Sequence, residues 1–330
     1  MKLITVTPNE AGQRLDKLLV KYLNKAGKGF IYKMLRKKNI TLNNQKAVGS
    51  ERLQIGDEIK LFFSEETITK FSEVKVNETS TNLNIIYEDK HILILNKPAG
   101  VLSQKAKDTD VSLVEAIISY LLQTGELTQE NLRSFRPSIC NRLDRNTSGL
   151  VIAGKSLAGL QEMSAALKER TIEKYYQCIV FGELSDSCHI EGFLRKDEKT
   201  NQVKIYQEEI KDGRPIQTAY TPLAGNQNYT LLKVKLITGR THQIRAHLAS
   251  IGHPIVGDYK YGGAQVNRKC LQQYGIYSQL LHSGELVFPQ LTGQLSYLSK
   301  KRFEAPLPDY FMTMLKGEHL LSWVPGIQEV

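Results

Sequence analysis

The sequence predicts an α+β protein, with a small N-terminal α+β module and a larger domain built on a mixed, largely antiparallel sheet with flanking helices. Three observations lead to this prediction. The first 64 residues combine helical periodicity with short strands, residues 65–82 are polar without an apolar period, and alternating polar and apolar residues dominate the strands after residue 83. We therefore expect a module at 1–64, a linker at 65–82 that lets it reorient, and a second domain at 83–330.

The N-terminal module is expected to contain two helices, a hairpin and a further strand. Four apolar residues of the first helix follow an amphipathic i, i+3, i+4, i+7 pattern: Leu15, Leu18, Leu19 and Tyr22. The second helix, over residues 28–38, can turn an apolar face to a core with Ile31, Met34 and Leu35. Its other face presents three basic residues, Lys33, Arg36 and Lys37. Residues 40–46 form a tight hairpin around two asparagines, and residues 58–63 form a strand.

The larger domain begins with two strands at residues 84–97, which turn around Glu88-Asp89-Lys90. Helices are predicted at residues 112–122 and 157–168. Further strands are predicted at residues 150–153, 175–181 and 230–237.

Composition excludes several classes of protein. The chain is 41% hydrophobic and 24% charged, as an ordinary globular protein is. No apolar run approaches 18 residues, so we expect no membrane span, and the N-terminus lacks the features of a secretory signal. The four cysteines have no Cys-x-x-Cys spacing, which favours a reducing cytoplasm and disfavours a structural zinc site.

Positive charge is concentrated near the N-terminus. The net charge is +10, and residues 1–80 hold 15 Lys/Arg against 9 Asp/Glu. The segment from Lys28 to Lys46 contains six positive residues and no acid. Such a patch suits phosphate contacts along RNA, and a solvated basic surface is the alternative interpretation.

Residues 141–156, NRLDRNTSGLVIAGKS, allow two different interpretations. From Gly149 to Ser156 they match the Gly-x-x-x-x-Gly-Lys-Ser pattern of a phosphate-binding loop. The variable residues of that pattern are Leu-Val-Ile-Ala, which favour a buried strand over a loop of inward-pointing amides. The second interpretation is a turn that presents the carboxylate of Asp144 between Arg142 and Arg145, where a simple surface ion pair would contribute less than about 1 kcal/mol.

A second cluster, residues 237–248 (ITGRTHQIRAHL), favours a functional role for Asp144 over a simple surface ion pair. The spacing of Thr241 and Arg245 suggests the start of a helix, with Arg240 just before it. Arginines placed in this way can hold a carboxylate by two hydrogen bonds and can also contact phosphates. The histidines at 242, 247 and 253 do not share one helical face and have no carboxylate among them, so we expect no metal site.

Two family resemblances follow from these motifs. Residues 12–64, with RLDKLL, MLRKKNITLN and LQIGDEI in order, resemble the small RNA-binding module named after ribosomal small-subunit protein four. Residues 84–310 closely resemble the RluA-type pseudouridine synthases, through IIYEDKHILILNKPAG, NRLDRNTSGL, GRTHQIRAHL, LHSGELVF and EAPLP. The larger bacterial members that act on ribosomal RNA also begin with such a module.

The resemblance implies an isomerase that converts uridine to pseudouridine within RNA, without a cofactor or metal. It implies that Asp144 is the essential aspartate, that Tyr176 stacks on the uracil, and that Arg245 pairs with the aspartate. Arg142 matches the side chain that fills the space left by the flipped base. Tyr175 is expected on the opposite side of the strand. Asn141 departs from the family, since many members carry His there.

We expect further RNA contacts from the basic and polar side chains that flank these motifs, namely Arg240, His242, Lys33, Arg36 and Lys37. The carboxylate could attack the sugar or the ring, or remove a sugar proton. A ribosomal RNA substrate, of the large subunit, is favoured, and transfer RNA remains open. A non-catalytic RNA-binding or ribosome-assembly factor and a nucleotide hydrolase are the other hypotheses. We expect a monomeric cytoplasmic protein with RNA as its partner.

Overall fold

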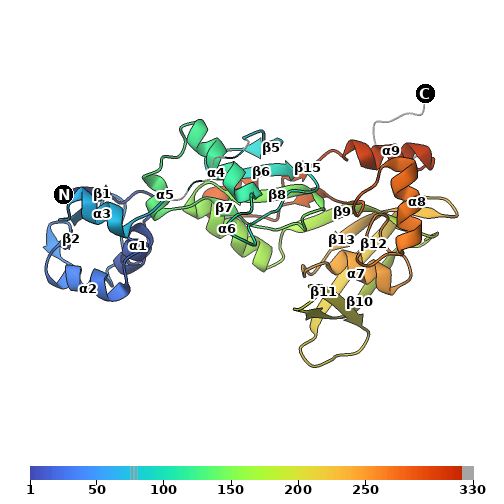
Figure 1. The fold of residues 1–330 in the computed structure, drawn as a ribbon, viewed down its shortest axis with the longest axis horizontal. Coiled ribbons are helices and arrows are strands. Elements are labelled where there is room, and N and C mark those ends of the chain that lie inside the picture. Colours follow the sequence, from blue (N-terminus) through green and yellow to red (C-terminus); the bar gives the residue numbers. More distant parts are fainter. Residues whose placement is uncertain (75, 77–78, 80, 322–330) are drawn as a thin grey trace.

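The computed structural model describes residues 1–74, 76, 79 and 81–321. Figure 1 shows an elongated molecule, with the N-terminal module in blue at one end. The elements of the module are β1 (Lys2–Thr5), α1 (Leu15–Tyr22), α2 (Lys28–Arg36), β2 (Ile40–Leu42), β3 (Gln45–Lys46), β4 (Glu58–Leu61) and α3 (Glu65–Phe71). Its strands form an antiparallel sheet in the order β1-β4-β2-β3.

The two helices predicted for the module are confirmed, and their apolar faces form its core. All seven predicted core residues of α1 and α2 are buried. The predicted hairpin is also confirmed: Asn43 and Asn44 have φ angles of 52° and 63°, the left-handed values that a tight β2–β3 turn requires. Strand β1 was not predicted, and it covers the edge of β4.

The prediction of a linker was wrong for residues 65–71, which form α3. The hydroxyl of Ser64 accepts a hydrogen bond from the backbone N–H of Thr67 and caps this helix. Ile68 is buried in the module core, and the ring of Phe71 lies 4.4 Å from that of Phe30. Two apolar residues one turn apart are therefore enough to dock a short, otherwise polar helix. Residues 75, 77, 78 and 80 of the expected linker lie outside the described residues, as do residues 322–330 of the expected second domain.

The larger domain contains one extended sheet and its flanking helices. Its elements are β5 (Ile85–Glu88), β6 (Ile92–Lys97), α4 (Leu113–Gln123), α5 (Asn131–Ser134), β7 (Ser138–Ile139), β8 (Ser148–Gly154), α6 (Leu157–Lys168), β9 (Glu173–Phe181), β10 (Cys188–Asp197), β11 (Gln202–Tyr206), β12 (Arg214–Gly225), β13 (Tyr229–Leu236), α7 (Gln243–Ser250), α8 (Ala264–Tyr274), β14 (Leu281–Val287), the 3-10 helix η1 (Gly293–Leu298), β15 (Arg302–Glu304) and α9 (Asp309–Gly317).

The strands of this sheet run in the order β11-β10-β12-β13-β9-β14-β8-β6-β5, with β15 beside β14 and β7 beside β8. Among the strand pairs of the described residues, only β14 and β8 run parallel. The predicted mixed, largely antiparallel sheet with flanking helices is confirmed.

Alternate residues of the central strands separate two hydrophobic cores. In β6, Leu93 and Leu95 join a core that also holds residues of α4, α7, α8 and α9. Ile92 and Ile94 point to the other side and pack with residues of α6 and η1. The sheet is therefore covered on both faces, which explains the nearly continuous apolar sequence of this strand.

Several elements were not predicted, for identifiable reasons. Strands β10 and β11 form the edge of the sheet and are largely exposed, so they lack a clear apolar alternation. Strand β14 is buried on both faces although it contains His, Ser and Glu residues, which resemble a loop in sequence. Over the residues that the structure describes, no helix has the length and apolar character needed to span a membrane.

Candidate active site

Asp144 lies on the loop between β7 and β8, where β8 meets β14. The two strands run in parallel, with Ser148 opposite His282. They approach so closely at Gly149 (φ 112°) that a Cβ atom there would lie 2.3 Å from the carbonyl oxygen of Ser283. Glycine is required at this position, because any side chain would clash and the backbone is left-handed. The close approach fixes the start of β8, which follows the Asp144 loop directly.

Strand β8 rules out the interpretation of residues 149–156 as a phosphate-binding loop. Residues 148–154 are extended and buried, as predicted for Leu150–Ala153. The lysine of the motif, Lys155, has a nearly buried side chain and pairs with Glu88 and Glu126, each at 2.6 Å. Its neighbour Ser156 caps α6. Neither motif side chain is available to hold a nucleotide phosphate.

Lys97 ties the Asp144 loop to the end of β6. It is fully buried, and its ammonium group donates hydrogen bonds to the carbonyl oxygens of Pro98 (2.9 Å), Val101 (2.9 Å) and Arg145 (3.1 Å). Burial lowers the pKa of Lys97 to about 7, against the opposing influence of the Asp144 charge. The lysine thus joins two loops that are 48 residues apart in the sequence.

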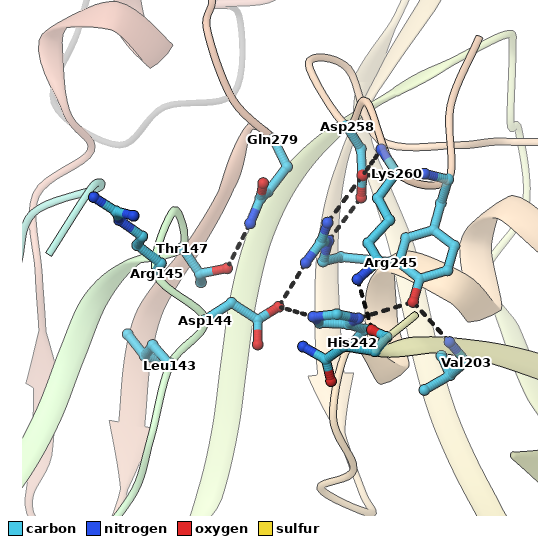
Figure 2. A network of polar contacts seen from close by, with 12 residues as sticks. Leu143, Asp144, Arg145, Thr147, Val203, His242, Arg245, Asp258, Lys260 and Gln279 are labelled. Carbon is cyan, nitrogen blue, oxygen red and sulfur yellow. Dashed lines mark hydrogen bonds and ion pairs between the residues drawn. The ribbon is translucent and has the colours of Figure 1, made fainter. Parts of the chain in front are cut away.

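Arg245 lies between two carboxylates, as Figure 2 shows. Its Nη1 donates to Asp144 Oδ2 at 2.9 Å. On the other side, its Nε and Nη2 donate to Asp258 Oδ2 and Oδ1, at 2.7 and 3.0 Å. Burial opposes the charge of Arg245, but the hydrogen bonds and charge of Asp258, together with Asp144, outweigh it and raise the pKa. The predicted pairing of Asp144 with a distant arginine is therefore present in the structure.

Asp258 is the site residue that the sequence analysis missed. Its side chain is fully buried, and it also accepts hydrogen bonds from the backbone N–H groups of Lys260 (3.0 Å) and Tyr261 (3.2 Å). The amide of Asn267, from α8, donates to the Asp258 carbonyl oxygen at 3.0 Å and fixes this turn. A Gly-Asp pair after a short apolar segment is a common turn signal, so nothing in the sequence connected it with Arg245.

His242 begins α7 in a left-handed conformation, with φ 53°. Its Nδ1 is 2.8 Å from the hydroxyl of Tyr261, and its Nε2 lies 3.9 Å from Asp144 Oδ2. Burial lowers the pKa of His242, although the charge of Asp144 opposes the shift. A residue expected to contact RNA is thus also a neighbour of the site carboxylate.

Tyr176 lies beneath the site on β9, directly opposite Ser283 of β14. It is buried, and burial raises the pKa of its hydroxyl to about 12; the side chain of Ser283 opposes this increase, and the charge of Asp144 adds to it. Tyr175 follows the alternation of the strand and lies among polar side chains, where it donates to Glu173 and lies 4.6 Å beneath the ammonium of Lys233. The distinction predicted between the two tyrosines is therefore present.

Asn141 has a local structural role. Its side-chain Oδ1 accepts a hydrogen bond from the backbone N–H of Ile152 at 2.8 Å, and its Nδ2 donates to the carbonyl oxygen of Leu150 at 3.2 Å. The side chain therefore binds β8. Arg142, the next residue, is exposed and lines the cleft above Asp144.

These residues surround a cleft of about 970 Å³. The lining includes five of the predicted site residues from the large domain in addition to Arg245, namely Arg142, Asp144, Tyr176, Arg240 and His242. Other basic side chains also line it: Lys105, Arg145, Lys168, Arg170, Lys174, Lys196 and Lys260. Asp144 is the only carboxylate among the described residues of this lining. The cleft thus presents one anion within a strongly positive surface, which suits a polyanionic ligand.

The three predicted basic residues of the module are not part of this cleft. Lys33, Arg36 and Lys37 are exposed on and just after α2. Within the described residues, no group of three or more His, Cys, Asp or Glu residues is arranged to hold a metal ion.

Comparison with known sequences agrees with a cleft that binds a polyanion, because the similar proteins are named as enzymes that act on RNA. A family model described as RNA pseudouridylate synthase matches residues 91–250. The chain is 30% identical over 302 residues to the ribosomal large subunit pseudouridine synthase C of Vibrio vulnificus, covering 87% of this chain and 88% of the relative. It is 29% identical over 330 residues to the protein of the same name from Escherichia coli O157:H7, covering 94% of each.

Solved structures share the fold at low sequence identity. Human RNA pseudouridylate synthase domain-containing protein 4 superposes with a TM-score of 0.56 at 20% identity, covering 72% of this chain and 93% of that chain. The corresponding human protein 1 gives a TM-score of 0.51 at 20% identity, covering 74% and 97%.

Proposed function

Because the chain belongs to the RluA-type family of RNA pseudouridine synthases, we propose that it isomerises specific uridines of large-subunit ribosomal RNA, with Asp144 as its catalytic carboxylate. Members of this family are isomerases that act on RNA. The substrate is proposed because the relatives from Vibrio vulnificus and Escherichia coli are named as synthases of the ribosomal large subunit.

One observation carries the catalytic assignment: Asp144 is the single carboxylate among the described residues lining a basic cleft, and Arg245 holds it at 2.9 Å. The reaction breaks a glycosidic bond, turns the uracil, and rejoins it through carbon 5. Positive charge developing on the sugar is stabilised by a nearby anion, and Asp144 is placed to supply it. Arg245 orients this carboxylate, since two of its other nitrogens are fixed by Asp258.

Tyr176 offers a surface on which the uracil can bind. Its aromatic ring lies in the cleft wall close to Asp144, and an aromatic face is a favourable surface for a flipped base. Burial raises the pKa of its hydroxyl to about 12, so the hydroxyl stays protonated well above neutral pH and can donate a hydrogen bond. We propose that it stacks against the target base.

We propose that the side chain of Arg142 fills the space that the target base leaves when it flips out of the RNA. A uridine in folded RNA cannot reach Asp144 unless it leaves the stack, and the vacated space must then be filled. Arg142 is exposed, two residues from Asp144, and its long planar head group suits this task. Arg240 and His242 line the same cleft and are proposed to contact the RNA backbone. We propose that the protein works in the cytoplasm, where its four cysteines are free thiols.

The test compares the full-length protein with Asp144→Asn on a large-subunit ribosomal RNA transcript, followed by mapping of pseudouridines. We expect the substitution to reduce turnover by at least about 10³-fold, because it removes the anion while keeping the shape. Asp309→Asn, at an exposed helix start, is the matched control. Near-normal turnover by Asp144→Asn would overturn the catalytic role. Modification of transfer RNA alone would overturn the ribosomal substrate and leave the activity in place.

A further inference from the structure

The N-terminal module makes buried polar contacts with the larger domain. Ser134, at the end of α5, donates its hydroxyl to Glu10 Oε1 at 2.7 Å, and both side chains are buried. The hydroxyl of Tyr22 donates to Glu130 Oε1 at 2.6 Å, and the ammonium of Lys2 lies 3.0 Å from the same oxygen. A buried carboxylate that relies on a donor from the other domain favours one relative position of the two bodies.

Arg133 adds to this contact from the same helix. Its guanidinium lies 5.7 Å from the centre of the Tyr22 ring, and it donates to the hydroxyl of Ser72. The predicted reorientation of the module thus has to break several interactions on α5. Figure 1 shows the module meeting the rest of the molecule at this helix.

The module also contacts the start of α6. Asn9 Oδ1 accepts a hydrogen bond from the backbone N–H of Leu157, the first residue of that helix, at 2.9 Å. This N–H has no partner within the helix, so the module supplies one. At the other end of α6, Leu167 and Lys168 line the catalytic cleft. A helix of 12 residues is about 18 Å long, which sets the separation between the module contact and the cleft.

The surface from the catalytic cleft toward α5, where the module is docked, is hollowed and carries basic side chains. A second cavity, of about 430 Å³, shares Gln104 and Lys105 with the catalytic cleft. It extends to Arg136, two residues after α5. Lys105 and Arg136 both approach the buried carboxylate of Glu115, at 3.7 and 3.9 Å, which holds their positions. Glu115 lines the same cavity, so its two cations and one carboxylate leave a net positive charge along the path of an RNA strand from the cleft toward the module.

We propose that these contacts hold the module at a fixed distance from the cleft, so that the enzyme selects uridines by a second RNA segment bound at α2. This inference rests on the proposed function. The basic residues Lys33, Arg36 and Lys37 then engage that segment while the target uridine occupies the cleft. Binding at one site makes binding at the other intramolecular, and a rigid connection avoids the entropy of orienting the module.

The test uses the full-length chain with the triple substitution Asn9→Ala, Glu130→Ala and Ser134→Ala. These residues make the docking contacts and lie outside both the cleft and the α2 face. Undocking lets Glu10 reach water, so the module itself can remain folded. The matched control is Asn228→Ala, Glu208→Ala and Ser187→Ala, three exposed positions of the same residue types on the larger domain.

Two measurements are made on both variants and the unchanged protein. Small-angle X-ray scattering reports the radius of gyration, which we expect to rise only in the docking variant. Turnover is measured on large-subunit ribosomal RNA fragments of decreasing length around the modified uridine. We expect kcat/KM of the docking variant to fall about tenfold on long fragments and to equal that of the unchanged protein on the shortest fragment.

Equal scattering and equal kcat/KM on every fragment would overturn the proposal. An equal loss on long and short fragments would also overturn it, because the contacts would then serve only the fold of the larger domain. If the unchanged protein formed no pseudouridine on any RNA, the proposed function would fail instead, and the scattering result would still report on docking.

Discussion

Arg245 and Asp258 form a buried two-point ion pair, Nε to Oδ2 at 2.7 Å and Nη2 to Oδ1 at 3.0 Å. Asp258 is fixed in turn by two backbone N–H groups of its own turn. The guanidinium therefore has one remaining direction in which Nη1 can donate, and Asp144 lies there. We propose that Asp258 acts on the reaction through this orientation, since Arg245 lies between it and the cleft carboxylate.

Asp258→Asn tests this positioning. An amide can accept only one of the two hydrogen bonds and brings no charge, so Arg245 loses its fixed orientation. Removing one partner of a buried ion pair costs about 3 kcal/mol of stability, and a misplacement of about 1 Å at a catalytic site can cost about 10²-fold in rate. We expect a lower melting temperature and a drop in kcat with little change in KM. Asp212→Asn, on an exposed turn, is the control, and a variant with unchanged kcat would contradict the positioning role.

Lys97 predicts an unusual dependence of stability on pH. Its pKa is about 7 in the folded protein, where burial lowers it, and about 10.5 in the unfolded chain. Between these values the unfolded chain binds more protons, so stability rises with pH, by up to about 1.4 kcal/mol per unit. Urea unfolding between pH 7 and 9.5 should show that Lys97→Met removes this increase. The exposed Lys90→Met should keep it, and equal slopes in all three proteins would refute the shifted pKa.

Lys155 is expected to serve stability and not nucleotide binding. Its nearly buried ammonium pairs with two carboxylates, so Lys155→Ala leaves Glu88 and Glu126 close together without a counter-charge. We expect a loss of about 1–3 kcal/mol in stability and pseudouridine formation within about twofold of normal. Thermal melting and turnover with and without ATP measure both. Activity that required ATP and disappeared in the variant would restore the nucleotide-loop interpretation.

If the basic face of α2, formed by Lys33, Arg36 and Lys37, binds RNA, it should account for part of the salt dependence of RNA binding. If Lys33, Arg36 and Lys37 each contact one phosphate, replacing all three with Ala reduces the slope of log K against log salt by about 2. Binding to a large-subunit ribosomal RNA fragment is measured at several NaCl concentrations. Lys211, Lys269 and Lys316, exposed on the larger domain, are replaced with Ala as a control of equal charge. An unchanged slope in the first variant would exclude the face from the RNA contact.

Much of the local structure was predictable, because it depends on short-range patterns. The apolar spacing of α1 and α6 and the paired asparagines of the β2–β3 turn specify their conformations within a few residues. The choice of strand over phosphate loop at residues 150–153 was also local, since β-branched and apolar residues favour a buried strand. The exposed strands β10 and β11 at the end of the sheet lack this information, because neither of their faces is fully covered.

The site was predictable only in part. Asp144 and Arg245 were identified through two motifs that resemble those of a known family. Asp258 and Lys97 were not assigned roles, since the partners that connect them to the site, Arg245 and the Arg145 carbonyl, are 13 and 48 residues away. Hydrogen bonds of this kind depend on where the sheet brings the loops together, and no period in the sequence records that.

The sequence by itself determined the class of fold and the family, and it singled out the carboxylate for which we propose the catalytic role. Tertiary structure decided that Arg245 is shared by two carboxylates, that His242 lies beside Asp144, and that the module rests on α5 and the start of α6. The physical reason is the range of the interactions. Backbone propensity and amphipathic spacing act within a few residues, whereas buried ion pairs and hydrogen bonds between domains require segments far apart in the chain to be fixed in space first.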